Sequence, residues 1–330
     1  MNACVLFWFL SVLFVFASCD EEDIDIKINQ EAKLRFYYGS MENYTELYIY
    51  EAHKIFSETW YDSSKSTVIF SHGFTGRPTG PAVTAVITAY IDEGKSNVVL
   101  LNWQDLASMA LPGFASSYMK WAAPNARKLG VRFANTLSNM AAAGLNLKKI
   151  HLIGHSLGAH LFGITGTTLA SRGMQPSCIT GLDPSRVGFD NKPYHLRLNP
   201  ESAESVVVVH TDSSKYGAKG SMGKVDFWPN FRNNGHVIQP GCDERPAQTF
   251  SMADLCNHNR CWELLIDSMK HPGTLLGSHA KNYRVWKNYS AEEKKAVTMT
   301  IGKCDPNAVP GNYYLTTNAE TPFGRGEEGL

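Results

Sequence analysis

The stretch KKIHLIGHSLGAH, from Lys148 to His160, decides the fold of this chain. Its first half is an apolar run typical of a buried strand, and a helical pattern follows over Ala159 to Arg172. Between the two, glycines on either side of Ser156 permit a sharp turn that lifts the serine hydroxyl above the sheet. A strand, a Gly-x-Ser-x-Gly turn and a helix in register predict that Ser156 is a nucleophile.

Apolar strands alternate with helical patterns along the rest of the chain, which predicts an α/β fold with a mainly parallel central sheet and helices on both faces. Such a sheet binds its ligands beyond the carboxyl ends of its strands. The expected strands are Lys33 to Tyr38, Glu46 to Tyr50, Thr67 to Ser71, Asn97 to Asn102, Lys149 to Ile153, Ser177 to Leu182 and Ser205 to His210. The expected helices are Pro81 to Glu93, Ser117 to Ala143 and Ala159 to Arg172.

The composition indicates one globular domain. Hydrophobic residues make up 43% of the 330 residues and charged residues only 19%, so the chain can bury a large core and has no signature of disorder. The formal net charge is zero, which removes the electrostatic argument for a nucleic-acid partner. Because no repeat and no Pro/Gly/Ser-rich linker divides the chain, we expect a single domain over residues 20–330.

The N-terminus resembles a secretory signal peptide over residues 1–19. An apolar run from Val5 to Ala17 precedes the acidic stretch that starts at Asp20, where we expect the cut. A signal anchor is the alternative, although the run is shorter than the roughly 20 residues of a membrane-spanning helix. We therefore expect a secreted, extracellular protein with N-glycosylation acceptors at Asn43 and Asn288.

Removal of residues 1–19 leaves five cysteines: Cys178, Cys242, Cys256, Cys261 and Cys304. An odd number in an oxidising compartment leaves one thiol unpaired within the chain. Cys178 is the expected free thiol, because it lies in an apolar segment that reads as a buried strand. A cut that spares Cys19 would make the number even.

A nucleophilic serine needs a histidine base, and that histidine needs a carboxylate that fixes its tautomer. In this architecture the chain order is serine, acid, histidine, with the acid just past a later strand. Asp183 closes an apolar strand segment and precedes a proline that stops further pairing, so we favour it. Asp212, after the next strand segment, and Asp190, in a loop, are the competing candidates.

Among the histidines downstream of Asp183, we favour His258 as the base. It lies in an expected loop before a helical pattern from Trp262 to Met269, and Cys256 two residues earlier can anchor it. A metal site at Cys256, His258 and Cys261 is an alternative, but the spacing fits no usual zinc pattern, and we expect neither a metal nor a cofactor.

Two further histidines, His155 and His160, flank the serine in sequence. We expect both to be packed structural groups, because one occupies the turn and the other starts the helix behind it. Two backbone amides must stabilise the oxyanion of a tetrahedral intermediate. We expect them at Leu157, which follows the nucleophile, and at Phe74, which follows Gly73 at an earlier strand end.

These residues belong to a larger set of motifs, and in combination the chain resembles the pancreatic lipase family. The motifs are His72-Gly-Phe74, Leu101-Asn-Trp103, Gly154-His-Ser-Leu-Gly-Ala-His160, Gly181-Leu-Asp-Pro184, His210-Thr-Asp212, Val225-Asp-Phe-Trp-Pro229 and Cys256-Asn-His258. The whole mature chain is similar to the catalytic domain of that family, and most similar to the insect secreted lipases and phospholipases A1. The resemblance implies an α/β-hydrolase fold, the roles given above, and a lid bridged by Cys242 and Cys256.

Departures from the family pattern refine what the resemblance implies. No residues remain for a C-terminal β-sandwich, so no colipase partner is expected, and we expect a monomer that acts on lipid at a membrane or micelle surface. Only thirteen residues separate Cys242 from Cys256, and the segment between His210 and Asp226 is also short. Short loops of this kind are the pattern of phospholipase A1 members, which implies release of the sn-1 fatty acid through an acyl-enzyme.

Other interpretations of the resemblance stay open at this point. A triacylglycerol or galactolipid lipase is one alternative, and a non-catalytic storage protein like the related insect yolk proteins is another. The yolk proteins lack the catalytic serine, whereas Ser156 is present here. The reduced cysteine content leaves a bridge between Cys261 and Cys304 as a guess.

Overall fold

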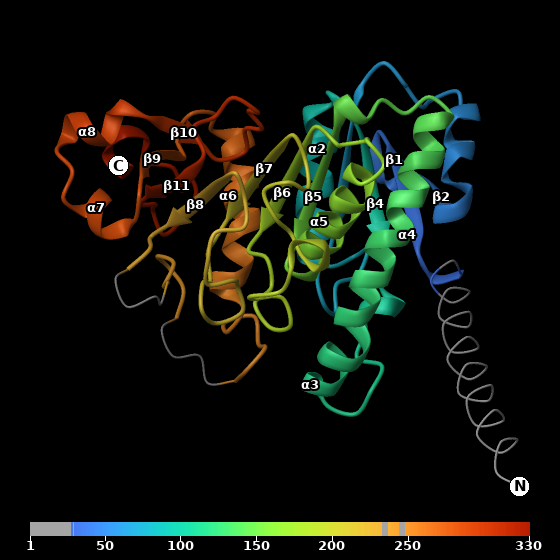
Figure 1. The fold of residues 1–330 in the computed structure, drawn as a ribbon, viewed down its shortest axis with the longest axis horizontal. Coiled ribbons are helices and arrows are strands. Elements are labelled where there is room, and N and C mark those ends of the chain that lie inside the picture. The colour runs from blue at the N-terminus through green and yellow to red at the C-terminus, as the bar shows by residue number, and fades with distance from the viewer. Residues whose placement is uncertain (1–27, 29, 233–236, 244–247) are drawn as a thin grey trace, which may run out of the picture.

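One twisted sheet organises the computed structural model, which describes residues 28, 30–232, 237–243 and 248–330 (Figure 1). Within these residues the strands follow the order β10-β9-β11-β8-β7-β6-β5-β3-β4-β1-β2. All pairs from β11 to β4 are parallel, and antiparallel strands flank them at both edges. The strands are β1 (Lys33–Tyr38), β2 (Ser40–Tyr48), β3 (Ser66–Ser71), β4 (Ser96–Asn102), β5 (Ile150–His155), β6 (Cys178–Leu182), β7 (Ser205–Val209), β8 (Val225–Pro229), β9 (Leu276–Ala280), β10 (Thr298–Thr300) and β11 (Gly311–Leu315).

Helices cover both faces of the sheet, which confirms the predicted α/β fold. The helices are α2 (Pro81–Glu93), α3 (Phe114–Ser117), α4 (Ala123–Ala142), α5 (Leu157–Ala170), α6 (Cys256–Lys270), α7 (Tyr283–Lys287) and α8 (Ala291–Ala296). Side chains of β3 alternate between the faces: Ile69 packs in the core with α4 and α5, while Phe70 packs in the core with α2 and α6. A parallel strand buried on both faces explains the continuous apolar runs in the sequence.

Several predicted bounds differ from the structure. β2 begins at Ser40 and ends at Tyr48, so the strand expected over Glu46 to Tyr50 was placed too late. The long helix expected from Ser117 to Ala143 is divided into α3, a π-helical turn at Tyr118–Ala122, and α4. Pro124 lies in the first turn of α4, directly after the π-helical turn, and it has no N–H to donate to a carbonyl oxygen of that preceding turn.

The disulfides differ from two expectations. Cys178, expected to be free, is bonded to Cys304, and the guessed pair of Cys261 with Cys304 is therefore wrong. Cys178 is buried, but it is the first residue of β6, where the loop after β10 can reach it. Among the cysteines that the structure describes, Cys261 is the free thiol, and it faces the core from α6. Cys242 and Cys256 are bonded to each other, as the family resemblance implies.

The expected signal peptide, residues 1–19, lies outside the described residues. Across the residues that the structure does describe, none of the helices has the length and apolar character needed to cross a bilayer.

Candidate active site

Ser156 occupies a strained turn between β5 and α5. Its backbone has φ 57° and ψ −117°, a conformation that L-residues other than glycine rarely adopt. The amide of Ser156 donates a hydrogen bond of 3.0 Å to the carbonyl oxygen of Leu182, at the end of β6. The turn is therefore fixed to the neighbouring strand, and the serine side chain stands at the carboxyl edge of the sheet.

The two glycines of the turn are required by close packing. A β-carbon on Gly158 would lie 2.4 Å from the carbonyl oxygen of Ser71, at the end of β3. A β-carbon on Gly154 would lie 2.4 Å from the carbonyl carbon of Gly158, so the two glycines also pack against each other. The start of α5 therefore presses directly on β3 and β5, and the Gly-x-Ser-x-Gly pattern follows from this contact.

Asp183 and His258 form a buried pair at the same edge of the sheet. The Oδ2 atom of Asp183 lies 2.6 Å from Nδ1 of His258. The other carboxylate oxygen of Asp183 accepts hydrogen bonds from the amides of Thr211, at 2.8 Å, and Asp212, at 3.0 Å. With both oxygens engaged, the carboxylate is fixed in the orientation that holds the imidazole.

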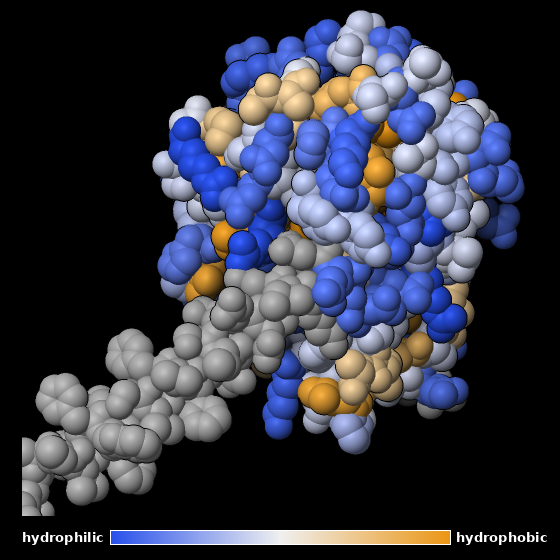
Figure 2. All heavy atoms as spheres, turned by 90° about the vertical axis from the view of Figure 1, so that its right-hand side faces the viewer, coloured by the Kyte–Doolittle hydropathy of each residue, from blue (hydrophilic) through white to orange (hydrophobic). Residues whose placement is uncertain are grey.

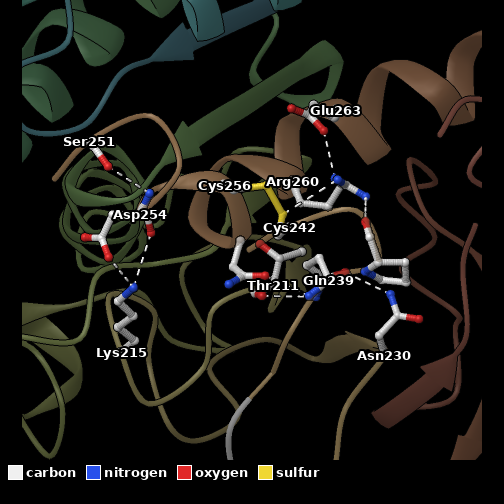
Figure 3. Close-up of a disulfide and its surroundings, with 12 residues drawn as sticks. Thr211, Lys215, Asn230, Gln239, Cys242, Ser251, Asp254, Cys256, Arg260 and Glu263 are labelled. Atoms are coloured by element: carbon white, nitrogen blue, oxygen red, sulfur yellow. Dashed lines mark hydrogen bonds and ion pairs between the residues drawn. A yellow bond between two sulfur atoms is a disulfide. The ribbon is translucent and has the colours of Figure 1, made fainter. Parts of the chain in front are cut away.

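His258 belongs to a helix and not to the loop expected from the sequence. It lies in the first turn of α6, which begins at Cys256. The disulfide to Cys242 ties down the start of this helix, as Figure 3 shows, and the side chain of Asn257 accepts a 2.7 Å hydrogen bond from the amide of Gln239. The prediction that Cys256 anchors the segment of His258 is therefore confirmed. Because Cys256 is bonded to Cys242, the alternative metal site at Cys256, His258 and Cys261 has lost one of its thiolates.

The competing carboxylates occupy different positions. Asp190 lies in a loop, 3.9 Å from Nε of Arg186. Asp212 lies beside the pair, because ligand atoms of Asp183, Asp212 and His258 are all within 4.8 Å of one another. Burial and the neighbouring Asp183 raise the pKa of Asp212 to about 7. The structure thus shows that Asp183 is the carboxylate hydrogen-bonded to His258. Asp212 is a second carboxyl group beside this pair.

Gly73 and Phe74 pass directly beside the serine. A β-carbon on Gly73 would lie 2.7 Å from Cβ of Ser156, so only glycine lets the backbone come this close. Thr75, next along the loop, donates its amide to the carbonyl oxygen of Ala107 at 2.8 Å, which holds the loop in place. Leu157 is the first residue of α5, where backbone amides have no partner within the helix. Both expected oxyanion residues therefore border Ser156.

His155 and His160 are structural, as expected. Nε2 of His155 lies 3.3 Å from the carbonyl oxygen of His258, and Nε2 of His160 lies 2.7 Å from that of Ser185. Burial lowers the pKa of each to about 3. With pKa values this low, both rings are poor bases for the serine.

A cleft of about 820 Å³ opens over Ser156 and His258. Its walls are mostly aromatic and apolar, and sequence reasoning missed most of them because they come from segments far apart in the chain. The side chains missed are Arg77, Phe114, Tyr118, Met119, Val187, Lys215 and Tyr216. Phe250, Met252 and Leu255, from the segment between the bridged cysteines, also line the cleft.

The described part of the expected lid, residues 248–255, is attached to the cleft wall through Asp254. One carboxylate oxygen of Asp254 lies 2.6 Å from Nζ of Lys215, and the other accepts a hydrogen bond from Tyr216 Oη (Figure 3 shows the lysine contact). The amide of Phe250 also donates to this carboxylate, at 2.8 Å, and the Phe250 ring stacks on Phe114. This segment therefore covers one side of the cleft and is fixed by an internal charge pair.

Apolar side chains are also exposed on both sides of α3. Met109 is 52% exposed and Met119 46% exposed, on either side of α3. Figure 2 shows apolar residues at the lower end of its face, the end at which Figure 1 places α3. Exposed apolar side chains in one region are typical of a surface that contacts a partner or a lipid.

Comparisons with known proteins found similar chains. The profile of the Lipase family matches residues 20–323. The chain is 36% identical over 227 residues to lipase member H-B of Xenopus laevis, covering 67% of this chain and 45% of the relative, so it spans about half the length of such relatives. It is 30% identical over 265 residues to phospholipase A1 of Vespa crabro, covering 78% of this chain and 83% of the relative. Among solved structures, a hyperthermophilic esterase from Pyrobaculum calidifontis is 14% identical, with a TM-score of 0.30 over 56% of this chain and 67% of that chain.

Proposed function

Because this chain belongs to the lipase family, we propose that it is a serine carboxylester hydrolase that cleaves acyl esters of lipids. In this proposal Ser156 is the nucleophile, His258 the base and Asp183 the acid that orients it. The observation that carries it is the 2.6 Å contact between His258 Nδ1 and Asp183 Oδ2 beside a serine held in a strained turn.

The reaction has two halves. Ser156 Oγ attacks the ester carbonyl carbon while Nε2 of His258 takes its proton, and a tetrahedral oxyanion forms. The oxyanion collapses, the bond from carbon to the alcohol oxygen breaks, and His258 returns the proton to that oxygen. The acyl chain stays on Ser156 until a water, activated in the same way, releases the fatty acid and restores the serine.

Three features of the site lower the barrier. The Asp183 carboxylate accepts a hydrogen bond from Nδ1–H of His258, which leaves Nε2 free as the proton acceptor and stabilises the imidazolium that forms. The amides of Phe74 and Leu157 are the oxyanion donors in this proposal. Leu157 also begins a helix of 14 residues, whose N-terminal dipole favours negative charge at that point.

Within the lipid esters, we propose a phospholipid substrate and release of the sn-1 fatty acid, which is phospholipase A1 activity. The short interval between Cys242 and Cys256 supports this choice, since a short lid leaves room for a polar head group. At about 25 cal/mol per Å², such a segment gains little by burying its apolar side chains, so we expect little rate increase when substrate passes from monomers to micelles. A triacylglycerol or galactolipid lipase is the alternative.

For the whole protein, we propose a secreted monomer that acts at a lipid surface without colipase. Two disulfides support an oxidising compartment. The sequons also suit secretion, because Asn43 on β2 and Asn288 after α7 are both exposed. Their glycosylation remains a prediction.

The test is product analysis with purified protein. Phosphatidylcholine, a galactolipid and triacylglycerol are offered separately, and the released fatty acid is assigned to its glycerol position. Preferred release of the sn-1 chain from phospholipid, absent in Ser156→Ala, supports the proposal. Triacylglycerol as the best substrate, with strong interfacial activation, would contradict the phospholipase proposal and favour a neutral lipase. A protein that hydrolyses none of the esters would favour the alternative of a non-catalytic storage protein.

A further inference from the structure

Charge around the cleft is strongly one-sided. Among the described residues that line it, the charged side chains are Arg77 and Lys215, and neither aspartate nor glutamate is present in that lining. Catalytic clefts that carry one sign of charge concentrate ligands of the opposite sign. The lining therefore favours a substrate with negative charge.

The two cations differ in their availability. Lys215 is already paired, because its Nζ lies 2.6 Å from Asp254 Oδ1. Arg77 is exposed, and within the described part of the chain it has no ion-pair partner. The free positive charge of the cleft is therefore the guanidinium of Arg77.

The loop that carries Arg77 also carries the residues beside the nucleophile. Gly73 lies against Ser156, and a turn closes from Gly73 to Gly76, whose amide donates to the Gly73 carbonyl oxygen at 3.1 Å. Arg77 follows at once and starts the next turn, in which its carbonyl oxygen accepts the amide of Gly80 at 2.9 Å. Two consecutive turns hold the backbone on both sides of Arg77 in place, and Arg77 lines the same cleft as Ser156.

The chemistry of a glycerophospholipid matches this arrangement. Its phosphate sits on the same glycerol as the sn-1 ester, a few bonds away, so an ester at Ser156 brings the phosphate into the same cleft. A guanidinium presents a planar pair of donors that fits a phosphate. A choline head group would add a positive charge where the lining has no carboxylate to receive it.

We propose that Arg77 is a specificity-determining residue that binds the phosphate, and that the preferred substrates are anionic glycerophospholipids such as phosphatidic acid and phosphatidylglycerol. This inference rests on the proposed ester hydrolysis and goes beyond it, because it names the head group and the residue that selects it. Zwitterionic phosphatidylcholine is then a poorer substrate of the same site.

The test uses short-chain lipids below their critical micelle concentration, so that binding to a charged surface does not contribute. The kcat/KM on dihexanoyl phosphatidic acid is divided by that on dihexanoyl phosphatidylcholine for wild type, Arg77→Gln, Arg77→Lys and Arg284→Gln. Arg284 is an exposed arginine on α7, outside the cleft lining, and provides a control with the same charge change. p-Nitrophenyl butyrate, which has no head group, reports on ester hydrolysis by the wild type.

We expect wild type to favour the anionic lipid and Arg77→Gln to lower the ratio about tenfold, as for loss of a charge-assisted hydrogen bond. Arg77→Lys should retain part of the preference, Arg284→Gln all of it, and added salt should weaken it in wild type. Wild type that is active on p-nitrophenyl butyrate but shows no anionic preference, or a ratio unchanged in Arg77→Gln, overturns this inference alone. Wild type inert on every ester overturns the proposed function together with it.

Discussion

At the floor of the cleft, Ser156, Asp183 and His258 each expose less than a tenth of their surface, whereas Met252 at the rim is 65% exposed. The floor is made by strand ends and held by backbone contacts: the amide of Ser156 bonds to Leu182, and a carboxylate oxygen of Asp183 bonds to Thr211. The rim is made by loops and by α3, and many of its contacts are between side chains. The difference indicates that the chemistry is fixed in advance while the choice of lipid is left to the rim.

This division predicts that changes at the floor abolish turnover or folding, and that changes at the rim alter which substrate is used. Five substitutions test it, from the largest expected effect to the smallest.

The largest effect is expected for Ser156→Ala. Removal of the nucleophile should lower kcat on any ester by at least about 10⁴-fold, because oxyanion stabilisation alone leaves a small remnant. Thermal unfolding should change little, and it can be measured on the same preparation. Turnover within tenfold of wild type would show that the floor does not carry the chemistry.

Asp183→Asn should lower kcat by about 10³- to 10⁴-fold. An amide in place of the carboxylate that faces His258 Nδ1 favours the wrong imidazole tautomer and no longer stabilises the imidazolium. Asp190→Asn is the matched control, since Asp190 lies in a loop near Arg186, and its activity should equal that of wild type. Equal losses in the two variants would remove the special role of Asp183.

Gly158→Ala should destabilise the fold by about 2 kcal/mol or more, measured by denaturant unfolding. Alanine in place of glycine usually favours a helix, but here the added carbon meets the backbone of β3, 2.4 Å from the Ser71 carbonyl oxygen. Gly220→Ala is the control, because a β-carbon there meets nothing within 4 Å. A stable, fully active Gly158→Ala would contradict the close packing of the turn.

Asp212→Asn should change how stability depends on pH. The pKa of Asp212 is raised to about 7 by burial, so between its ordinary value and pH 7 the folded state binds more protons than the unfolded state. The free energy of unfolding of wild type should therefore fall as pH rises through this interval. The variant should lose this fall, which denaturant unfolding of both proteins at pH 5 and pH 8 would reveal. An equal change in the free energy of unfolding between the two pH values in both proteins would contradict this role of Asp212.

The smallest effect belongs to the rim. Met252→Ser should lower the rate on phospholipid vesicles about fivefold, because the exposed side chain loses apolar burial in the lipid. Hydrolysis of a soluble short ester should stay the same. Val309→Ser, at an exposed position outside the cleft lining, should affect neither rate. Equal losses of rate on the soluble ester and on vesicles would show that Met252 affects the chemistry at the floor of the cleft and not lipid binding at the rim.

The floor could largely be predicted from the sequence because its signals are local. The turn around Ser156 needs glycines at fixed spacing, and Asp183 directly follows a strand whose apolar run is evident. The position of His258 was also found, through Cys256, but its helix was taken for a loop. Asn257 and Asn259 are typical of loops, and the disulfide and the Gln239 contact that hold the helix start come from elsewhere in the chain.

The pairing of Cys178 with Cys304 and most of the rim could not be predicted, because both depend on contacts between distant segments. Cys178 and Cys304 are 126 residues apart in sequence, and an apolar neighbourhood does not distinguish the buried end of a strand from its middle. Arg77 and Phe114 belong to no motif and line the cleft only once the sheet has brought their loops together. Properties of this kind follow from topology and not from local pattern.

The central claim is that Ser156 is the nucleophile, and active-site labelling tests it most directly. Wild type, Ser156→Ala and Asp190→Asn are treated with a fluorophosphonate, digested and mapped by mass spectrometry. We predict one label per chain, on the peptide that contains Ser156, in wild type and Asp190→Asn, and none in Ser156→Ala. A label on another residue would contradict the account. So would wild type that carries no label after treatment and still hydrolyses esters.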